Sequence, residues 1–492
     1  MLINPRLLEV NTRVWIRKFG NDARLRDIDQ RFIDELSEVG IEILWLMGVW
    51  KVNAGLAAKC CFGIDLMPGY VKALSDWKKE DVIGSPFAID DYVLNPALGT
   101  EDDLLKLKER LNKAGVKLFL DFIPNHFGAN TPLIKSHPEI FLQTDRDSFR
   151  KDPYAFFEYD NAGKPLYLVH GRDPFFPPWT DTVQLNYFEP AAREIMTEKL
   201  AYIASVADGA RCDMAMLPLN NVFQNTWMGV LSKLNYKKPG DEFWKTAIVK
   251  TKEKNPEFMF MAEAYWDLEW QLQQLGFDYT YDKRLSDRLS EGDIPGIKAH
   301  LQADKEFQLK SVRFIENHDE DRAITRLGRF KALAAAVVIS TIQGVRFYND
   351  GQFDGKKTKL PVQLGREPAE KPSVMIRKYY DTLLDAAKDE IFRKGTWQIL
   401  NPMNADPVNY SCDNFLAWYW SLGNEMRIVV INYSHSTSQC RLKMELPSDK
   451  YEISLKDLLT GAVYKRSVKE IAGPGLFIEL RGYQSHIFSL TL

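Results

Sequence analysis

Residues 84–128 read GSPFAIDDYVLNPALGTEDDLLKLKERLNKAGVKLFLDFIPNHFG and contain one complete helix-to-strand unit. Thr100 followed by Asp103 has the pattern of a capping box, so a helix is expected over Thr100–Ala114. The apolar run Val116–Phe122 comes directly after it and has the length and composition of a buried strand. This stretch therefore predicts an alternating α/β fold.

The same alternation of short apolar runs and amphipathic segments continues over the first 350 residues. It indicates repeated βαβ units and a parallel sheet. Eight strands are expected, near Glu9–Ile16, Glu42–Met47, Val116–Phe122, Ala210–Asp213, Phe258–Glu263, Phe277–Tyr281, Val312–Glu316 and Val345–Tyr348. Eight such units suit a closed (β/α)8 TIM barrel, whose active site lies at the C-terminal ends of the strands.

Two regions depart from this alternation. The number of residues between Asp121 on the third strand and Asp213 on the fourth is larger than one βα unit requires. The intervening residues are rich in proline, aspartate and aromatics. Near the C-terminus, alternating segments such as NFLAWYWSL and MRIVVINYS indicate an antiparallel β-sandwich. We expect a barrel over 1–126 and 188–395, a short inserted domain over 127–187 and a β domain over 396–492.

Composition excludes several classes of protein. The 492 residues are 45% hydrophobic and carry a net charge of −3, so neither nucleic acid nor an anionic membrane is an expected partner.

The five cysteines are odd in number and lack metal-ligand spacing, which favours free thiols in a reducing compartment. The N-terminal stretch lacks the signal-peptide pattern, and the longest apolar run, Ala332 to Ser340, is too short to span a bilayer. We expect a soluble cytoplasmic protein.

Four polar motifs fall at the ends of predicted barrel strands. They are Asp121-Phe-Ile-Pro-Asn125-His126 after strand three, Gly209-Ala-Arg211-Cys-Asp213 after strand four, Met261-Ala-Glu263-Ala after strand five and Glu316-Asn-His318-Asp319 after strand seven. A single aspartate at a strand end is more often a cap or an ion-pair partner. Four such motifs at one end of one barrel favour a catalytic site.

The residue types fit glycosidic bond cleavage, which needs one protonated and one ionised carboxyl group. Arg211 lies two residues before Asp213, so the two side chains share a strand face and the guanidinium favours the carboxylate form. Asp213 is therefore the expected nucleophile. Glu263 has apolar neighbours in sequence, such as Met261 and Ala264, which suit a general acid.

These motifs, in this order, resemble the conserved regions of glycoside hydrolase family 13, the α-amylase family, and the resemblance covers residues 9–350. It implies catalytic roles for Asp213 as nucleophile, Glu263 as acid/base and Asp319 as transition-state stabiliser. It also implies that Arg211 orients Asp213, that His126 and His318 bind the sugar ring at the cleavage point, and that Asp121 supports Arg211.

Some positions depart from the family pattern. Phe87 stands where the family usually has a tyrosine that stacks on the sugar ring, so we expect Phe87 to bind substrate by stacking. Met216 and Leu217 stand where typical α-amylases have a Lys-His pair. In the inserted segment, Phe175, Phe176 and Trp179 fit either sugar stacking or packing within the segment.

Calcium is the only cofactor that the resemblance brings in. Family calcium sites use the asparagine of the strand-three motif, here Asn125, with oxygens from the inserted domain and from the position of Leu217. The acidic residues of the insertion form no recognisable calcium-binding spacing. We expect no required cofactor, with Asn125 as a ligand only if calcium is bound.

The favoured function is retaining hydrolysis of α-glucosidic bonds, with α-1,4 bonds of maltooligosaccharides or α-glucans as substrate. One alternative is a transglycosylase or isomerase of the same family, such as a trehalose synthase-like enzyme. Another is a non-catalytic carbohydrate-binding or assembly protein, which would be expected to lack one of the three carboxyl groups. The sequence does not indicate an oligomeric state.

Overall fold

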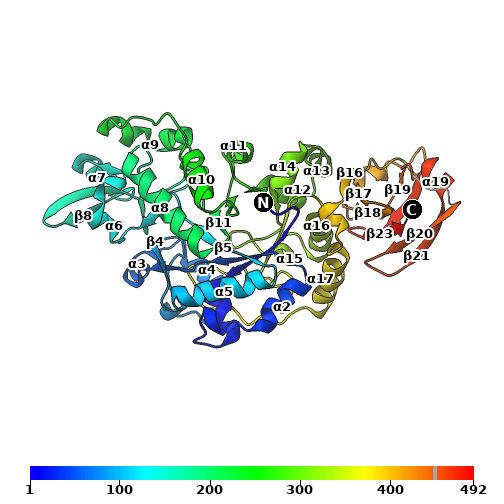
Figure 1. Cartoon of the computed structure of the whole chain (residues 1–492), viewed down its shortest axis with the longest axis horizontal. Helices are drawn as coiled ribbons and strands as arrows, with labels where there is room; N and C mark the ends of the chain where they lie inside the picture. The colour runs from blue at the N-terminus through cyan, green and yellow to red at the C-terminus, as the bar shows by residue number, and fades with distance from the viewer. Residues whose placement is uncertain (447–450, 492) are drawn as a thin grey trace.

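The computed structural model describes residues 1–446 and 451–491, and its centre is a closed barrel of eight parallel strands (Figure 1). The strands are β1 (Arg6–Asn11), β2 (Ile43–Met47), β5 (Lys117–Phe122), β11 (Gly209–Cys212), β12 (Met259–Ala262), β13 (Tyr279–Tyr281), β14 (Ser311–Arg313) and β15 (Val345–Asn349). They follow the order β1-β15-β14-β13-β12-β11-β5-β2, and β1 closes the ring against β2. The expected TIM barrel is confirmed.

Two of the expected strands are wrong in their bounds. The first was expected over Glu9–Ile16, but β1 begins at Arg6 and the residues Thr12–Trp15 form the short helix α1. Apolar residues continue through both elements, and a short apolar run does not by itself distinguish a strand from a helical turn. The seventh was expected to reach Glu316, but β14 ends at Arg313, so the motif that follows it lies on a loop.

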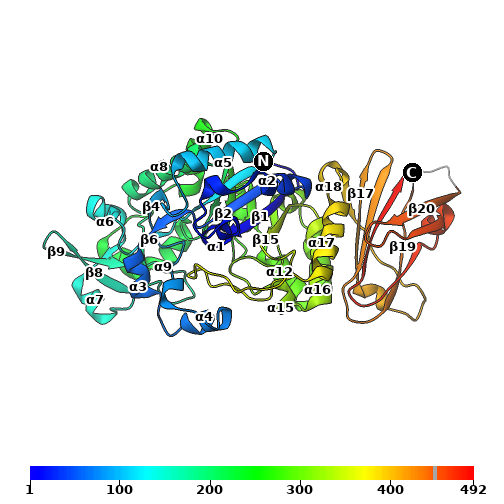
Figure 2. The ribbon, with the colours of Figure 1, turned by 90° about the horizontal axis from the view of Figure 1, so that it is seen from below.

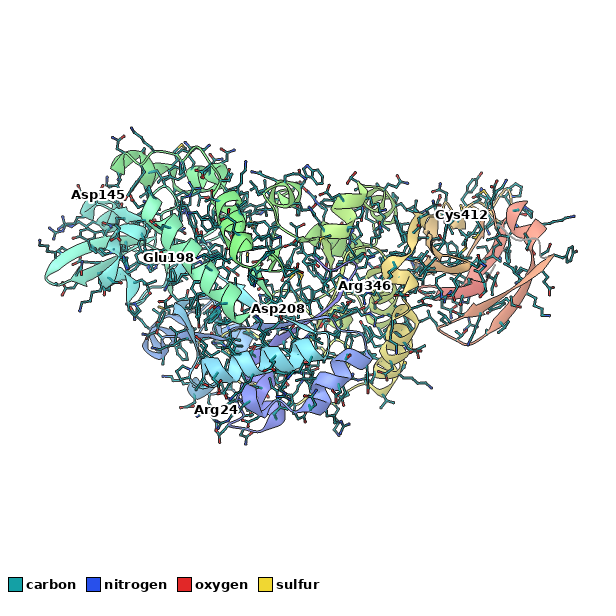
Figure 3. All side chains as sticks on the ribbon, viewed as in Figure 1. Arg24, Asp145, Glu198, Asp208, Arg346 and Cys412 are labelled. Atoms are coloured by element: carbon teal, nitrogen blue, oxygen red, sulfur yellow. The ribbon has the colours of Figure 1, made fainter. Side chains whose placement is uncertain are left out.

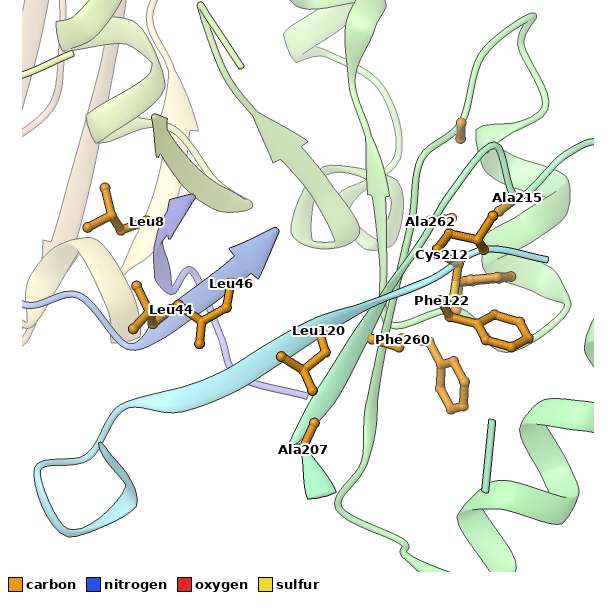
Figure 4. Close-up of a cluster of buried hydrophobic side chains, with 14 of the residues drawn as sticks. Leu8, Leu44, Leu46, Leu120, Phe122, Ala207, Cys212, Ala215, Phe260 and Ala262 are labelled. Atoms are coloured by element: carbon orange, nitrogen blue, oxygen red, sulfur yellow. The ribbon is translucent and has the colours of Figure 1, made fainter. Parts of the chain in front are cut away.

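Alternate side chains of the barrel strands pack into two separate cores. Those on the outer face lie beneath the helices, among them Leu8, Leu44, Leu46, Leu120, Phe122, Cys212, Phe260 and Ala262 (Figure 4). Those on the inner face fill the barrel, among them Leu7, Trp45, Met47, Phe119, Met261, Tyr279, Tyr281 and Phe347. Arg211 is in register with both Asp121 and Met261. The alternation of period two therefore turns Asp121 and Arg211 toward the barrel interior.

The helices wrap the barrel (Figures 1 and 2). They include α2 (Gln30–Glu38), α5 (Glu101–Lys113), α8 (Pro190–Val206), α9 (Asn220–Leu234), α10 (Phe243–Lys254), α12 (Lys283–Glu291), α13 (Ile294–Leu301), α16 (Arg329–Thr341) and α17 (Val374–Ala387). The predicted capping box of α5 is present: Asp103 N–H donates to Thr100 Oγ1 at 3.2 Å, and Thr100 N–H donates to Asp103 Oδ2 at 2.8 Å. Gly115 follows with a φ of +80°, a conformation that ends helices at low cost for glycine.

The segment between β5 and α8 carries its own small sheet. It contains β6 (His126–Gly128), α6 (Leu133–Ser136), β7 (Gln143–Thr144), α7 (Arg146–Lys151), β8 (Phe156–Asn161), β9 (Lys164–Val169) and β10 (Thr182–Gln184). Strands β7, β9 and β8 form an antiparallel sheet, and β10 pairs with β6. Because β6 and β10 pair, the segment leaves and returns at one place beside the barrel. We propose residues 127–187 as the inserted domain.

The C-terminal part is antiparallel, as expected. One sheet has six strands in the order β16 (Thr396–Ile399), β17 (Phe415–Leu422), β18 (Glu425–Asn432), β23 (Ser485–Thr491), β20 (Glu452–Asp457) and β21 (Val463–Ser467). The second sheet pairs β19 (Ser438–Leu442) with β22 (Leu476–Leu480), and a separate hydrophobic core joins the two. Trp420 Nε1 donates to Thr341 O at 2.7 Å and fixes this part against α16. Cys412 of this part and Asp145 of the inserted segment lie at opposite ends of the molecule (Figure 3).

Two further expectations concern the chain as a whole. Within the part of the chain that the structure describes, no helix is both long enough and apolar enough to cross a membrane. The five cysteines are all free thiols, as their odd number and spacing predicted.

Candidate active site

The C-terminal ends of the barrel strands open into a cavity of about 1270 Å³, which the inserted segment covers on one side. The three predicted catalytic carboxyl groups, those of Asp213, Glu263 and Asp319, are among the groups that line it, together with the imidazoles of His126 and His318. Its aromatic lining is Phe87, Tyr154, Phe176, Trp179, Tyr265 and Trp266. This volume exceeds that of ordinary small-molecule pockets, so it has room for a chain of several sugar rings.

Arg211 joins two of the three carboxyl groups. Its Nη1 lies 2.5 Å from Asp213 Oδ1, and its Nη2 lies 2.8 Å from Glu263 Oε2. Arg211 is completely buried. Burial alone would lower the pKa of Arg211, but Glu263, Tyr281 and Asp213 raise it well above its ordinary value. The guanidinium is therefore a fixed positive charge between the two carboxyl groups.

Aromatic rings enclose this guanidinium on its remaining sides. Its central carbon lies 5.1 Å from the ring centroid of Trp45, 5.4 Å from that of Phe87 and 5.8 Å from that of Tyr281. Ring faces attract a cation while excluding water. The enclosure therefore keeps Arg211 dry and strengthens its pairing with both carboxyl groups.

Glu263 is buried yet surrounded by polar partners. Its Oε2 accepts a hydrogen bond from Met214 N–H at 2.7 Å, and its Oε1 accepts one from the Tyr265 hydroxyl at 2.8 Å. Burial raises the pKa of Glu263 to about 7, with further repulsion from Asp213 and Asp319, against the opposing charge of Arg211. The pKa of Glu263 is thus raised in the direction expected for a general acid, and burial is the main cause.

Asp319 belongs to a chain of three charged groups. His318 Nε2 lies 2.9 Å from Asp319 Oδ2, and His318 Nδ1 lies 2.6 Å from Glu9 Oε1. Burial opposes the charged imidazole, but Asp319 and Glu9 raise the pKa of His318 well above its usual range. Partial loss of water around Asp319, deep in the cavity, opposes its carboxylate form, but His318 lowers the pKa of Asp319 to about 2. The Asp319 side chain is 47% exposed, so an ionised carboxylate faces the cavity.

Glu9 is a site residue that the sequence analysis missed. It lies on β1, is fully buried and forms a hydrogen bond with His318, which is 309 residues away in sequence. A glutamate between the apolar residues Leu8 and Val10 of a barrel strand is a signal that could have identified it, because a carboxylate inside a barrel strand needs a buried partner.

The other predicted residues also gather at this end of the barrel. Asp121 accepts hydrogen bonds from Trp45 Nε1 at 3.1 Å and from Gly48 N–H at 2.7 Å, and it supports Arg211 through its charge. Burial raises the pKa of Asp121 to about 6. Burial also lowers the pKa of His126 to about 4, which leaves His126 neutral where His318 is charged.

The aromatic candidates divide between two environments. Phe87 is half-buried, with its ring over Arg211 and 5.5 Å from the ring of His318. Phe176 and Trp179 line the cavity, and the Trp179 ring lies 5.2 Å from that of His126. Phe175 instead packs edge-on against Trp266 at 5.1 Å. Phe176 and Trp179 therefore face the cavity.

Asn125 is buried next to His126 but does not line the cavity. Its amide oxygen accepts a hydrogen bond from Gln184 Nε2 at 3.0 Å. Residues 1–446 and 451–491 hold no group of three histidine, cysteine, aspartate or glutamate side chains arranged for a metal ion.

Comparison with known proteins assigns the family. The profile of the family described as "Alpha amylase, catalytic domain" matches residues 33–399. This chain belongs to the α-amylase family. It is similar to Alpha-amylase MalA of Haloarcula japonica, at 24% identity over 54% of this chain and 36% of that protein. It is also similar to Alpha-amylase 2 of Dictyoglomus thermophilum, at 20% identity over 78% of this chain and 63% of that protein. Both alignments thus span less than two thirds of the relative's length.

Solved structures of the α-amylase family share the whole fold. A "noncanonic maltogenic alpha-amylase AmyB" from Thermotoga neapolitana superposes with a TM-score of 0.67 at 20% identity, covering 99% of each chain. The cyclic α-maltosyl-(1→6)-maltose hydrolase of Arthrobacter globiformis gives a TM-score of 0.65 at 14% identity. The family match contains all four polar motifs but begins after β1. Glu9, which holds His318, therefore lies outside the matched residues.

Proposed function

We propose that this protein is a retaining glycosidase that cleaves α-glucosidic bonds through a covalent glycosyl-enzyme intermediate. The observation that carries the proposal is that one buried guanidinium, that of Arg211, pairs with the carboxyl groups of both Asp213 and Glu263. Neighbouring nitrogens of one guanidinium hold the two carboxyl groups close together. Retaining enzymes need a short separation of about 5–5.5 Å, whereas inverting enzymes leave room for a water.

The two carboxyl groups have surroundings that suit different tasks. Asp213 points into the cavity from the end of β11 and would attack the anomeric carbon, displacing the leaving sugar. Glu263 would donate its proton to the leaving oxygen, because a pKa of about 7 keeps much of it protonated at neutral pH. After the leaving sugar departs, Glu263 would take a proton from the water that releases the covalently held sugar.

Asp319 and the two histidines would bind the ring that is being cleaved. The Asp319 carboxylate, fixed by a charged His318, can accept hydrogen bonds from sugar hydroxyls. It also places negative charge near the positive charge that develops on the ring in the transition state. His126, which is neutral, can both donate and accept a hydrogen bond.

The proposed substrates are maltooligosaccharides or α-glucans, cleaved at α-1,4 bonds. Two curated relatives are named as α-amylases, and a solved structure of the same fold is named as a maltogenic α-amylase. The size of the cavity and its exposed aromatic rings suit a chain of sugars, whose apolar faces stack on aromatic side chains. All three carboxyl groups are present in the cavity, which argues against a protein that only binds carbohydrate.

The stereochemistry of the first product tests this proposal. The protein is incubated with maltooligosaccharides, and the anomeric proton signals are followed by NMR before mutarotation. Release of the α-anomer first is the expected result, while release of the β-anomer first would rule out Asp213 as a nucleophile. Product sizes from α-glucans, disaccharides and sucrose then separate hydrolysis from transfer, since a trehalose synthase-like enzyme would give new disaccharides.

Phe87 is expected to stack on the sugar at the cleavage point. Phe87→Ala should reduce kcat/KM by an amount equivalent to roughly 2–4 kcal/mol, because the ring's apolar contact with the sugar is lost. Phe87→Tyr should have a mild effect, because the ring face remains. The measurement is kcat/KM on a maltooligosaccharide for both variants.

Because the Phe87 ring also covers Arg211, the thermal unfolding midpoint of each variant serves as a control. An alanine variant with unchanged kcat/KM would show that Phe87 does not contact the sugar.

A further inference from the structure

A buried amide group lies where the inserted segment leaves and returns to the barrel, at the pairing of β6 with β10, which is called the neck below. Gln184, the last residue of β10, is completely buried. Its Nε2 donates toward three oxygen atoms: the backbone oxygen of Asn125 at 2.9 Å, Oδ1 of Asn125 at 3.0 Å and the backbone oxygen of Leu185 at 3.0 Å. Three oxygens from two parts of the chain thus converge on one nitrogen.

Converging carbonyl and amide oxygens are the kind of ligands that hard cations such as calcium take. Here the point of convergence is filled by a hydrogen-bond donor that the protein supplies itself. The three distances of 2.9–3.0 Å are those of N–H···O hydrogen bonds rather than of calcium–oxygen bonds. None of the three oxygens belongs to a carboxylate, so the set carries no charge to offset that of a divalent cation.

The orientation of the Gln184 amide follows from these acceptors. Turning the amide by half a turn would place Oε1 against three oxygens and leave the NH2 group without acceptors. Oε1 itself has no hydrogen-bond partner among the described residues. The three acceptors therefore fix Nε2 in place even though the other end of the amide is left unpaired.

This amide connects the inserted segment to the cavity. Gln184 is in register with His126 of β6, and Leu185 N–H donates to the backbone oxygen of Asn125 at 3.1 Å. Asn125 Nδ2 in turn lies 3.3 Å from His126 Nδ1. The contacts of Gln184 thus hold the returning end of the segment against the residues that position His126.

We propose that the Gln184 amide takes the place of a divalent cation at the neck of the inserted segment, so that the fold and the position of His126 do not depend on metal. Asn125 is then a hydrogen-bond acceptor for Gln184 rather than a calcium ligand. Replacing Gln184 with aspartate, whose side chain is one carbon shorter, should vacate the point that Nε2 fills and supply a carboxylate, so that the same three oxygens can hold a cation. The inference concerns folding and metal binding, so it stands or falls independently of which sugar the protein cleaves.

The wild-type protein gives the first test. Its thermal unfolding midpoint is measured after exhaustive treatment with EDTA and again with added calcium chloride, and its metal content is measured by plasma mass spectrometry. We expect the same midpoint in both conditions and no stoichiometric calcium. A midpoint that falls with EDTA and recovers with calcium, or one tightly held calcium per chain, would overturn the proposal.

The second test uses Gln184→Asp with Gln273→Asp as its matched control. Gln273 is also buried, but its Nε2 donates to one oxygen, Thr280 Oγ1 at 2.9 Å, so no ring of oxygens surrounds it. In EDTA both variants should unfold at lower temperature than wild type, because each buries an unpaired carboxylate.

Calcium should raise the unfolding midpoint of Gln184→Asp by a few degrees and should leave that of Gln273→Asp unchanged. The rise should grow with calcium concentration, because calcium binds only the folded state. Equal responses of the two variants, or none in either, would show that the three oxygens are not arranged as a cation site. If Gln184→Asp does not fold without calcium, the yield of refolded protein with and without calcium chloride gives the same comparison.

Discussion

Replacing Asp213 with asparagine is expected to lower kcat/KM by at least about 10⁴-fold, equivalent to about 5.5 kcal/mol at the transition state. Asparagine has almost the same shape and keeps an oxygen toward Arg211, so the barrel should fold normally. It lacks the carboxylate that forms the glycosyl bond. The loss should therefore appear in turnover, while the thermal unfolding midpoint changes little.

The same substitution should alter Glu263 in a measurable way. Asp213 is one of the groups that raise the pKa of Glu263, and Arg211 is its main opposing charge. Without the Asp213 carboxylate, Arg211 pairs with Glu263 alone, so the pKa of Glu263 should fall. Residual activity toward maltooligosaccharides, which needs the Glu263 proton, should then decline with rising pH at a lower value than in the wild type.

Asp241→Asn is the matched control for Asp213→Asn. Asp241 also pairs with an arginine, Arg193, at 3.2 Å, but on the surface and away from the cavity. Its substitution should leave kcat/KM unchanged, since exposed ion pairs contribute little. If Asp213→Asn kept a substantial part of wild-type turnover, or if both variants lost activity equally, Asp213 could not be the nucleophile.

The parts of the fold and of the active site that depend on local sequence were predictable. The capping box at Thr100 and Asp103 forms within one helical turn, and short-range hydrogen bonds determine it. The pairing of Arg211 with Asp213, the residue directly after β11, follows from the alternation of side chains along an extended chain. The common placement of Asp213, Glu263 and Asp319 follows from the geometry of parallel barrels, in which all strands end at the same face.

The parts that depend on contacts between distant segments were not predictable. Glu9 and His318 are 309 residues apart. They meet because closure of the barrel pairs β1 with β15, which lies next to β14, the strand before His318. The partners of Glu263 also come partly from another strand, since Arg211 belongs to β11. Sequence neighbours describe the surroundings of a side chain poorly when its contacts form across strands. For the same reason, the three acceptors of Gln184 were not apparent before the fold was known.

Replacing Glu263 with glutamine should separate substrates by their leaving groups. For maltooligosaccharides, kcat/KM should fall by about 10²–10⁴-fold, because the sugar oxygen leaves poorly without a proton. For an aryl α-glucoside with an acidic phenol, kcat/KM should fall far less, since it reports the steps up to phenol release and the phenolate needs no proton. The comparison of both substrates on one variant removes any general effect of misfolding.

The pH dependence gives an independent measure of the same role. Glu263 acts as an acid only when protonated, and its pKa is raised to about 7, so wild-type kcat/KM for oligosaccharides should fall as the pH rises through about 7. Glutamine cannot ionise, so this alkaline decline should be absent from the Glu263→Gln variant. A variant that kept the decline would place the titrating group elsewhere. The same fractional loss on both kinds of substrate would mean that Glu263 stabilises the site through Arg211, Met214 and Tyr265 without donating a proton.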